Sequence, residues 1–265
     1  MRFTVVTPVF NGMPWLPECI ASVNAQRADV DVEHLVYDAG STDGSREWLQ
    51  ANAGRAILHF EQDRGQADAL HKGLTAATGT VLGWLNADDI LEPRALARVA
   101  AAFERDADAV AVVGSCLMID ARGVPHEALA APERTSLEEL LSVPNNLPQQ
   151  STFFTRDAYR AVGGLDASFS LAFDGDLWRR LAAHGRILSM PTEVLARYRI
   201  HPASRTQSNA ALSAREDLRS RRRFGQKLAS YAGLTLLKRG YLYPLLPAGS
   251  LEAARKVVNM LRGSG

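Results

Sequence analysis

The sequence lacks the features of a disulfide-bonded or membrane-spanning protein. Its two cysteines, Cys19 and Cys116, stand in no CxxC spacing, so neither a disulfide framework nor a cysteine zinc site is expected. No apolar run approaches the roughly 20 residues of a membrane span. The chain enters a strand-like pattern at Arg2 without a signal-type segment before it. We therefore expect a cytoplasmic protein in a reducing compartment.

Three common ligand-binding motifs are also missing. The chain has no GxxxxGK loop, no GxGxxG fingerprint and no acidic spacing of an EF-hand. These absences argue against a P-loop site, a dinucleotide-binding domain and an EF-hand calcium site. Any nucleotide or cation must therefore be held by other residues.

The net charge is only +1 over 265 residues, but it is unevenly distributed. From Arg215 onward there are 11 Lys plus Arg against 3 Asp plus Glu, whereas residues 1–214 carry 19 against 26. Because the positive excess is confined to the tail and no recognition motif accompanies it, nucleic-acid binding is not expected. With 46% hydrophobic residues, the chain can form one large domain, with or without an appendage.

The first 116 residues alternate strand and helix patterns. Alternation of this kind predicts βαβ units and a mainly parallel sheet flanked by helices, which is an α/β fold. The expected strands are 3–9, 32–38, 56–61, 80–85 and 109–116, and the expected helices are 15–26, 45–52, 66–77 and 93–103.

Polar residues gather where the first four strands stop. Asn11 follows the first strand, Asp38 ends the second, Asp63 follows the third, and Asp88 and Asp89 follow the fourth. In an open α/β sheet the ligand crevice lies beyond the carboxyl ends of the strands. We therefore expect a ligand site at this edge.

Beyond residue 116 the pattern becomes irregular. We expect a turn at 120–123, helices at 136–142, 157–162 and 176–184, and strands at 151–154 and 194–200. The predicted organisation is a domain of residues 1–205, followed by a basic helical C-terminal extension of residues 206–265. Within the domain, residues 1–116 form the nucleotide half and residues 117–205 the acceptor half.

The turn after the fourth strand carries the strongest cation signal. Asn86, Asp88 and Asp89 end the buried run of residues 80–85, and adjacent carboxylates there suit Mg²⁺ or Mn²⁺. The alternative is a polar turn that caps the helix beginning at Pro93.

Two glycine-containing loops offer nucleotide contacts. Asp38 could accept hydrogen bonds from a base or ribose, although Ser41, Thr42 or Asp43 could simply cap the next helix. Arg64 could clamp a diphosphate at a helix N-terminus, with Lys72 leaning to the same edge. The alternative for Arg64 is a solvated surface side chain.

The segment of residues 174–180 offers a candidate base. Two residues on a helix diverge by about 200° when they are two positions apart, so Asp174 and Asp176 cannot both serve one reacting group. Asp176 can pair with Arg180 four residues later, which leaves Asp174 as the candidate base or as a plain helix cap. His201, on the same side of its strand as Arg199, could ligate a cation, touch phosphate or be an ordinary surface histidine.

Together these segments resemble glycosyltransferase family 2, the inverting enzymes with a GT-A fold that use nucleotide sugars. The resemblance covers roughly residues 1 to 205, and its motifs occur in family order. They are Thr7-Pro8-Val9-Phe10-Asn11-Gly12, Asp38 with Gly40 to Ser45, Asp63-Arg64-Gly65-Gln66, Asp68-Ala69, Lys72-Gly73, Trp84 to Asp89, Gly163 to Asp166, Asp174 to Trp178, and Tyr198 to His201.

The resemblance implies a role for each matching residue. Asp88 would bind the metal within Asn86-Ala87-Asp88, which matches the DxD motif, and His201 would contact metal or phosphate. Asp174 would be the catalytic base. The sequence departs from the family pattern at Asn86, where a carboxylate is usual, and at Gly175, where an aromatic is common. The donor-binding residues would be Pro8, Phe10, Asn11, Asp38, Arg64, Gln66, Asp68, Lys72, Asn86, Ala87 and Asp88.

The implied activity is transfer of a sugar from a nucleotide-diphosphate sugar to an acceptor hydroxyl with inversion, in assembly of a cell-surface polysaccharide or glycan. A UDP-sugar is the favoured donor, with GDP or dTDP possible, and Mn²⁺ or Mg²⁺ is the expected cofactor. An ordinary aspartate with a pKa of about 3.9 would already be ionised at neutral pH, so no large shift is required of Asp174.

The tail has its own possible partners. A basic helical stretch begins at Ser220 to Arg223 and leads into the Leu- and Tyr-rich segment 234–247. A final helix is expected after it, with an apolar stripe from Leu251 to Leu261. Such a surface suits an anionic membrane, where a lipid-linked acceptor would be found at the inner face. A helix packed on the body, or an oligomer contact, is the alternative.

Two other function classes stay open. A sugar nucleotidyltransferase would need a Gly-rich, Arg-containing loop after the first strand, where this chain has residues 8–12, Pro-Val-Phe-Asn-Gly. A non-catalytic nucleotide-sugar-binding module would bind donor, but its Asp174→Asn variant would show no loss of turnover.

Overall fold

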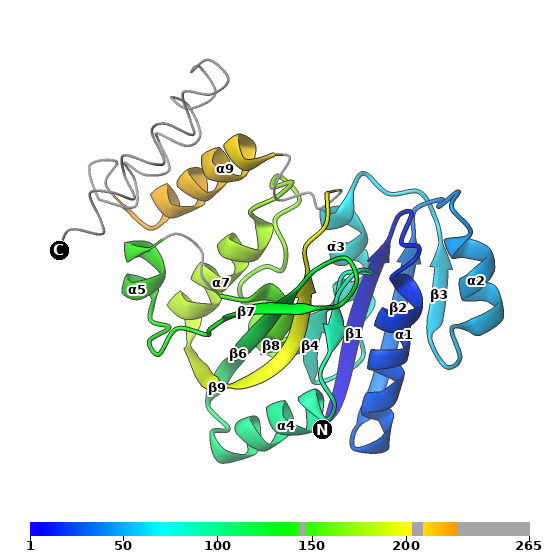
Figure 1. Ribbon diagram of the computed structural model, residues 1–265. Helices are drawn as coiled ribbons and strands as arrows, with labels where there is room; N and C mark the ends of the chain where they lie inside the picture. Colours follow the sequence, from blue (N-terminus) through cyan, green and yellow to red (C-terminus); the bar gives the residue numbers. More distant parts are fainter. Residues whose placement is uncertain (144–146, 203–208, 227–265) are drawn as a thin grey trace.

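The computed structural model describes residues 1–143, 147–202 and 209–226. Within them, one mixed sheet is flanked by helices (Figure 1). The strand order is β3-β2-β1-β4-β8-β6-β9-β5, with β7 paired to β6. The strands are β1 Arg2–Val9, β2 Asp31–Asp38, β3 Ile57–Phe60, β4 Val81–Trp84, β5 Ile90–Leu91, β6 Ala109–Ile119, β7 Pro125–Leu129, β8 Thr152–Thr155 and β9 Arg186–Arg199.

The helices lie between these strands in the order that the sequence predicts for residues 1–116. The α-helices are α1 Leu16–Ala25, α2 Ser45–Asn52, α3 Gln66–Ala76, α4 Ala95–Arg105, α5 Leu137–Ser142, α6 Arg156–Ala161, α7 Phe173–His184 and α9 Ala210–Arg223. Two short 3-10 helices, Gln26–Ala28 and Gln149–Ser151, complete the described elements.

The first four strands form a parallel part of the sheet. Strands β1, β2, β3 and β4 are parallel neighbours, so their carboxyl ends meet at one edge, which is uppermost in Figure 1. The continuation is mixed, because β8 pairs antiparallel with both β4 and β6. The expected parallel sheet is therefore confirmed for the first four strands, and the rest of the sheet contains antiparallel pairs.

Side chains of the central strands alternate between two cores. In β1, Val6 packs with the cluster that includes α3 and α7, whereas Phe3 and Val5 pack with the cluster that includes α1 and α4. This is the two-residue period of a strand that is covered on both faces. Packing on both faces of the sheet therefore fixes the position of the edge that carries the polar residues.

The second half differs from the sequence prediction at two elements. The strand expected at 194–200 is the end of the 14-residue β9, which continues through Pro191 where its register with β6 shifts. A proline is tolerated in a strand at such an irregularity. Helix α7 begins at Phe173 rather than at 176, which places Asp174 in its first turn.

Part of the C-terminal extension packs on the body. Helix α9 runs beside α7 (Figure 1), and its Ser220 hydroxyl donates to Asp176 Oδ1 at 2.7 Å. For this helix the alternative of packing on the body is correct. The Leu- and Tyr-rich segment and the last predicted helix lie outside the described residues. Among the described residues, no helix combines the length and apolar character needed to cross a membrane.

Candidate active site

The loops after β1 and β2 are tied together by hydrogen bonds. The Asn11 main-chain N–H donates to Ser41 Oγ at 2.8 Å, and the Thr42 N–H donates to Asn11 Oδ1 at 2.9 Å. Asn11 adopts the left-handed conformation, with φ of 54°, that asparagine tolerates better than most residues. Asn11 therefore joins the two loops, and its predicted contact with the donor stays a prediction.

Asp38 ends β2 with a buried carboxylate that is 1% exposed. Its Oδ1 accepts hydrogen bonds from the main-chain N–H and the hydroxyl of Ser41. Among the described residues, Oδ2 has no hydrogen-bond partner. A buried acceptor without a donor is unfavourable, so this oxygen suits an N–H group supplied by a ligand.

Three predicted donor-binding residues border the same loops without forming polar contacts there. Phe10 is 68% exposed, Pro8 is partly buried opposite Tyr37 of β2, and Ala87 is buried with Val9 in a small core cluster. Phe10 is thus accessible to a ligand, whereas Ala87 packs in the core next to the end of β1.

The N-terminus of α3 carries an ion-pair cluster. Arg64, whose side chain is 83% exposed, pairs with Asp68 at 2.9 Å, and Lys72 Nζ lies 3.6 Å from Asp68 Oδ2. Lys72 also donates to the carbonyl of Gln62 at 3.1 Å. The hydrogen bond from Arg64 lowers the pKa of Asp68 from its ordinary value. The solvated alternative for Arg64 agrees with this arrangement, and contact with a diphosphate stays a prediction.

Gln66 connects α3 to the acidic turn. Its Nε2 donates to Asn86 Oδ1 at 2.6 Å, and Asn86 Nδ2 donates to Asp89 Oδ2 at 3.2 Å. Asn86 also donates to Gln149 Oε1 at 3.3 Å. The residue that replaces the first DxD carboxylate is therefore part of an amide network.

Asp89 is not placed to share a cation with Asp88. Its side chain is fully buried, Oδ1 accepts from the Arg199 N–H at 3.0 Å, and Oδ2 accepts from Gln150 Nε2 at 3.1 Å. Burial, followed by the charge of Asp88, raises its pKa well above the ordinary value. The expectation that both adjacent carboxylates collect a cation is wrong, because Asp89 joins the turn to β9.

Asp88 meets His201 across 113 residues of sequence. His201 Nε2 lies 2.9 Å from Asp88 Oδ2, and the Trp15 ring packs on the imidazole at 4.1 Å between centroids. The Asp88 side chain remains 27% exposed. A carboxylate and an imidazole are side chains that can act as ligands of Mn²⁺. Mg²⁺ commonly binds one or two carboxylates together with substrate phosphates. Among the described residues, no group of three or more His, Cys, Asp or Glu could hold a metal alone.

Arg199 is one of the site residues to which the sequence assigned no role. Its side chain is 1% exposed, Nε donates to the Asp88 carbonyl at 2.9 Å, and Nη2 pairs with Glu18 at 2.6 Å. Nη1 reaches the carbonyls of Asp120 and Ala121 at 3.3 Å. Its position two residues before His201, on the same side of the strand, was the available signal.

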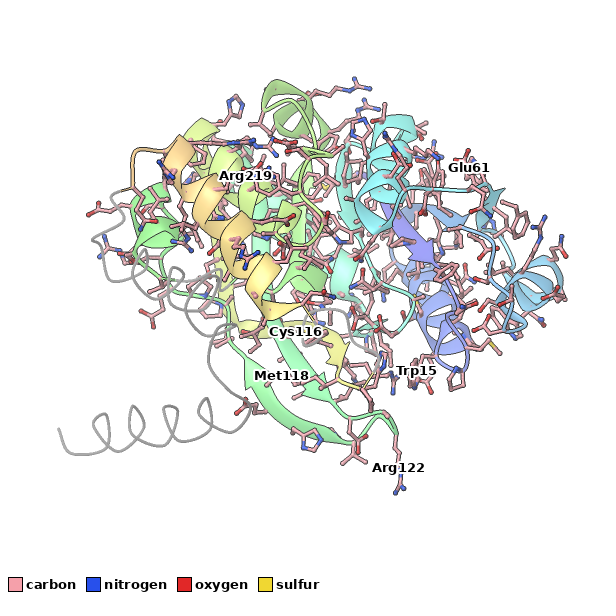
Figure 2. All side chains as sticks on the ribbon, turned by 90° about the horizontal axis from the view of Figure 1, so that it is seen from above. Trp15, Glu61, Cys116, Met118, Arg122 and Arg219 are labelled. Carbon is pink, nitrogen blue, oxygen red and sulfur yellow. The ribbon has the colours of Figure 1, made fainter. Side chains whose placement is uncertain are left out.

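Trp15, the N-cap residue of α1, adds a further contact to this group. Its indole Nε1 donates to the Ala121 carbonyl at 3.0 Å. Figure 2 shows Trp15 on the side of the molecule where Arg122 marks the outer end of the β6–β7 hairpin. The hairpin turn, the start of α1 and the end of β9 thus surround the pair of Asp88 and His201.

Asp174 lies in the first turn of α7, where the Gly175 N–H donates to its Oδ1 at 2.7 Å. Burial raises the pKa of Asp174 to about 6, with a further contribution from Asp217. A carboxyl with this pKa is still largely ionised at neutral pH, and the role of Asp174 as base stays a prediction. The predicted pairing of Asp176 with Arg180 is confirmed at 2.8 Å, which assigns Asp176 a structural role.

Aromatic packing brings the start of α7 to the strand that precedes the acidic turn. The Phe173 ring lies 6.2 Å from Trp84, and the Trp178 ring stacks on Trp84 at 5.4 Å. Trp84 ends β4 two residues before Asn86. The candidate base and the candidate cation ligand are thus carried by elements that pack directly on each other.

Comparison with known proteins assigns the family. A profile described as Glycosyl transferase family 2 matches residues 4–156. The chain belongs to glycosyl transferase family 2. An uncharacterised glycosyltransferase of Nostoc sp. (strain PCC 7120) is 30% identical over 232 residues, which is 83% of this chain and 71% of the relative. A PGL/p-HBAD biosynthesis glycosyltransferase of Mycobacterium bovis (strain BCG) is 31% identical over 179 residues, 66% of this chain and 67% of the relative.

Solved structures share the fold of this family 2 chain. TarS residues 1–349 of S. aureus, in complex with UDP-GlcNAc, align with a TM-score of 0.64 at 16% identity, covering 92% of this chain and 73% of that one. The mannosyltransferase PcManGT of Pyrobaculum calidifontis, in complex with GDP-Man and Mn²⁺, also gives 0.64 at 20% identity, covering 98% and 80%. The predicted GT-A fold and the resemblance to a glycosyltransferase are confirmed.

Proposed function

We propose that this family 2 glycosyltransferase transfers a sugar from a nucleotide-diphosphate sugar to an acceptor hydroxyl with inversion, aided by a divalent cation. The observation that supports this most strongly is the 2.9 Å contact between Asp88 and His201. Two residues with metal-binding side chains, far apart in sequence, meet at the carboxyl edge of the sheet. Ligands of α/β sheets bind at this edge.

The donor site is assigned to the loops after β1 and β2. Asp38 Oδ2, which has no hydrogen-bond partner in the described part of the chain, would accept the ring N–H that uracil, thymine and guanine possess and that cytosine and adenine lack. The exposed ring of Phe10 is available to stack on the base. A UDP-sugar is favoured and GDP- or dTDP-sugars are possible, and structural neighbours were solved with UDP-GlcNAc and GDP-Man.

The cation would be Mn²⁺ or Mg²⁺, held by Asp88 and His201. Two protein ligands suit a cation that takes its remaining ligands from a diphosphate and water. When bound, the cation would neutralise negative charge on the departing diphosphate. Arg64 and Lys72 would add positive charge there if they exchange Asp68 for phosphate oxygens.

Asp174 is the proposed base. Its carboxylate would take the proton of the acceptor hydroxyl while that oxygen bonds to the anomeric carbon. The bond from the anomeric carbon to the diphosphate oxygen breaks, and its electron pair leaves with the diphosphate. Attack from the face opposite the leaving group gives inversion. A pKa of about 6 suits a base that works near neutral pH.

The acceptor is proposed to be a glycan or a lipid-linked sugar in cell-surface glycan assembly. A mycobacterial relative is named for biosynthesis of PGL/p-HBAD. A cytoplasmic position, with peripheral contact at the inner face of the membrane through the tail, stays a prediction.

The test combines donor binding with turnover. Nucleotide sugars are screened with Mn²⁺ for thermal stabilisation, because a ligand of the folded state raises the apparent melting temperature. Turnover is then compared between wild type and Asp174→Asn. The proposal expects turnover to fall at least about 100-fold, with donor affinity within about twofold of wild type. Unchanged turnover would reject Asp174 as base, and binding without any transfer would favour a binding module.

A further inference from the structure

Helix α9 places a buried carboxylate against the start of α7. Glu216 is 7% exposed, and its Oε2 accepts hydrogen bonds from the main-chain N–H groups of Leu171 at 2.8 Å and Ala172 at 3.0 Å. The Ser170 N–H reaches both oxygens, at 2.9 and 3.1 Å. These three donors immediately precede α7, whose second residue is Asp174.

The geometry at this point requires a carboxylate. Three N–H groups converge on one side chain at the positive end of a helix, where an anion is favoured. A glutamine would offer one oxygen to three donors and would turn its own N–H groups toward them. Removing the charge therefore leaves main-chain N–H groups short of acceptors, that of the buried Ala172 among them, even though the side chain keeps its size.

A second, separate set of contacts holds α9 against the side of α7. Asp217 pairs with Arg179 and Arg221, and the Ser220 hydroxyl donates to Asp176. Arg221 Nη1 also donates to the Leu141 carbonyl at 2.8 Å. Because these contacts do not involve Glu216, α9 is expected to stay docked when the charge of Glu216 is removed.

We propose that Glu216 is a positioning residue for Asp174, so that the C-terminal extension is part of the catalytic apparatus. The proposal rests on the proposed role of Asp174 as the base. Asp174 follows Ala172 by two residues, so a shift of the segment held by Glu216 moves the carboxylate of Asp174. Misplacement of a reacting group by about 1 Å can lower turnover about 100-fold.

The test compares Glu216→Gln with Arg222→Ala, a control at an exposed position of the same helix. We expect kcat of Glu216→Gln to fall about 10- to 100-fold, with Kd for the donor and Mn²⁺ unchanged within about twofold. Hydrogen exchange should accelerate at residues 170–172, while the amides of α9 keep their protection. A kcat equal to that of Arg222→Ala, or unchanged exchange at 170–172, would overturn the proposal.

A shorter acid provides a second variant if Glu216→Gln fails to fold. Glu216→Asp keeps the charge but ends one methylene earlier, so it should also lower kcat while donor affinity is retained. Wild-type kcat in Glu216→Asp would then overturn the proposal. Retained turnover in Asp174→Asn would reject the assignment of Asp174 as the base. The hydrogen-exchange measurement is independent of turnover, and it tests whether Glu216 holds residues 170–172.

Discussion

Arg199 Nε donates a 2.9 Å hydrogen bond to the main-chain carbonyl of Asp88, from a strand 111 residues further along the chain. The same guanidinium pairs with Glu18 of α1 and reaches the turn of the β6–β7 hairpin. The proposed cation ligand therefore has its backbone fixed by three distant segments. This arrangement supports the proposed function of the turn after β4 as part of a cation site.

Replacing Arg199 should destabilise the fold and weaken the cation site together. Arg199→Met removes the hydrogen bonds of this buried side chain and leaves the carbonyls of the half-buried Asp88 and Asp120 without these donors, so we expect a loss of about 3 kcal/mol in the free energy of unfolding. Denaturant titration measures this loss. Arg197→Met, on the same strand with a more exposed ion pair to Glu92, should lose less than about 1 kcal/mol. Equal losses would contradict the role given to Arg199.

Turnover should depend on an acid with a raised pKa. The pKa of Asp174 is raised to about 6 by burial, so the ionised form, which accepts the proton, is lost as pH falls through that value. The rate at saturating donor, acceptor and Mn²⁺ should fall tenfold for each pH unit below about 5. A rate that stays level down to pH 4 would show that no such group acts in the rate-limiting step.

Removing the imidazole of His201 should weaken cation binding in the presence of the nucleotide. We expect the apparent Kd of Mn²⁺, measured by calorimetry with saturating UDP, to rise at least about tenfold in His201→Ala. His126→Ala is the control, since His126 is exposed on β7. An unchanged Kd in His201→Ala would mean that the imidazole only orients Asp88.

Base selectivity should depend on Asp38. Asp38→Asn removes the negative charge and presents to the base either a neutral oxygen or an N–H group. UDP affinity should therefore fall about 10- to 100-fold, the range of one hydrogen bond to a charged group. CDP serves as the matched ligand, because cytosine offers no ring N–H to this oxygen. An equal loss for UDP and CDP would place the base elsewhere.

The sequence predicted the parallel half of the sheet and the family, because strand patterns and motifs are local properties. The pairing of Asp176 with Arg180 was predictable for the same reason, since residues four apart on a helix are neighbours. The distinction between Asp88 and Asp89 was not predictable. It depends on the β5–β9 pairing, which places Asp89 beneath the Arg199 N–H.

The role of α9 was also hidden from sequence patterns. Its high charge favours an exposed surface helix, yet Glu216, Asp217 and Arg221 are buried. Their partners outside α9 lie on α7, in the segment before it and in α5, between 38 and 80 residues away, and composition gives no sign of such pairing. The raised pKa of Asp174 follows from the same packing, since it results from burial and from Asp217.

The most direct test is a crystal structure of the complex with Mn²⁺ and the donor that stabilises the protein best, with the metal located by its anomalous signal. The account predicts that the cation is ligated by Asp88 and His201 and by diphosphate oxygens, with the base near Asp38. It also predicts that the Asp174 carboxylate faces the anomeric carbon from the side opposite the diphosphate. A cation bound away from Asp88, or an Asp174 carboxylate turned away from the sugar, would contradict it.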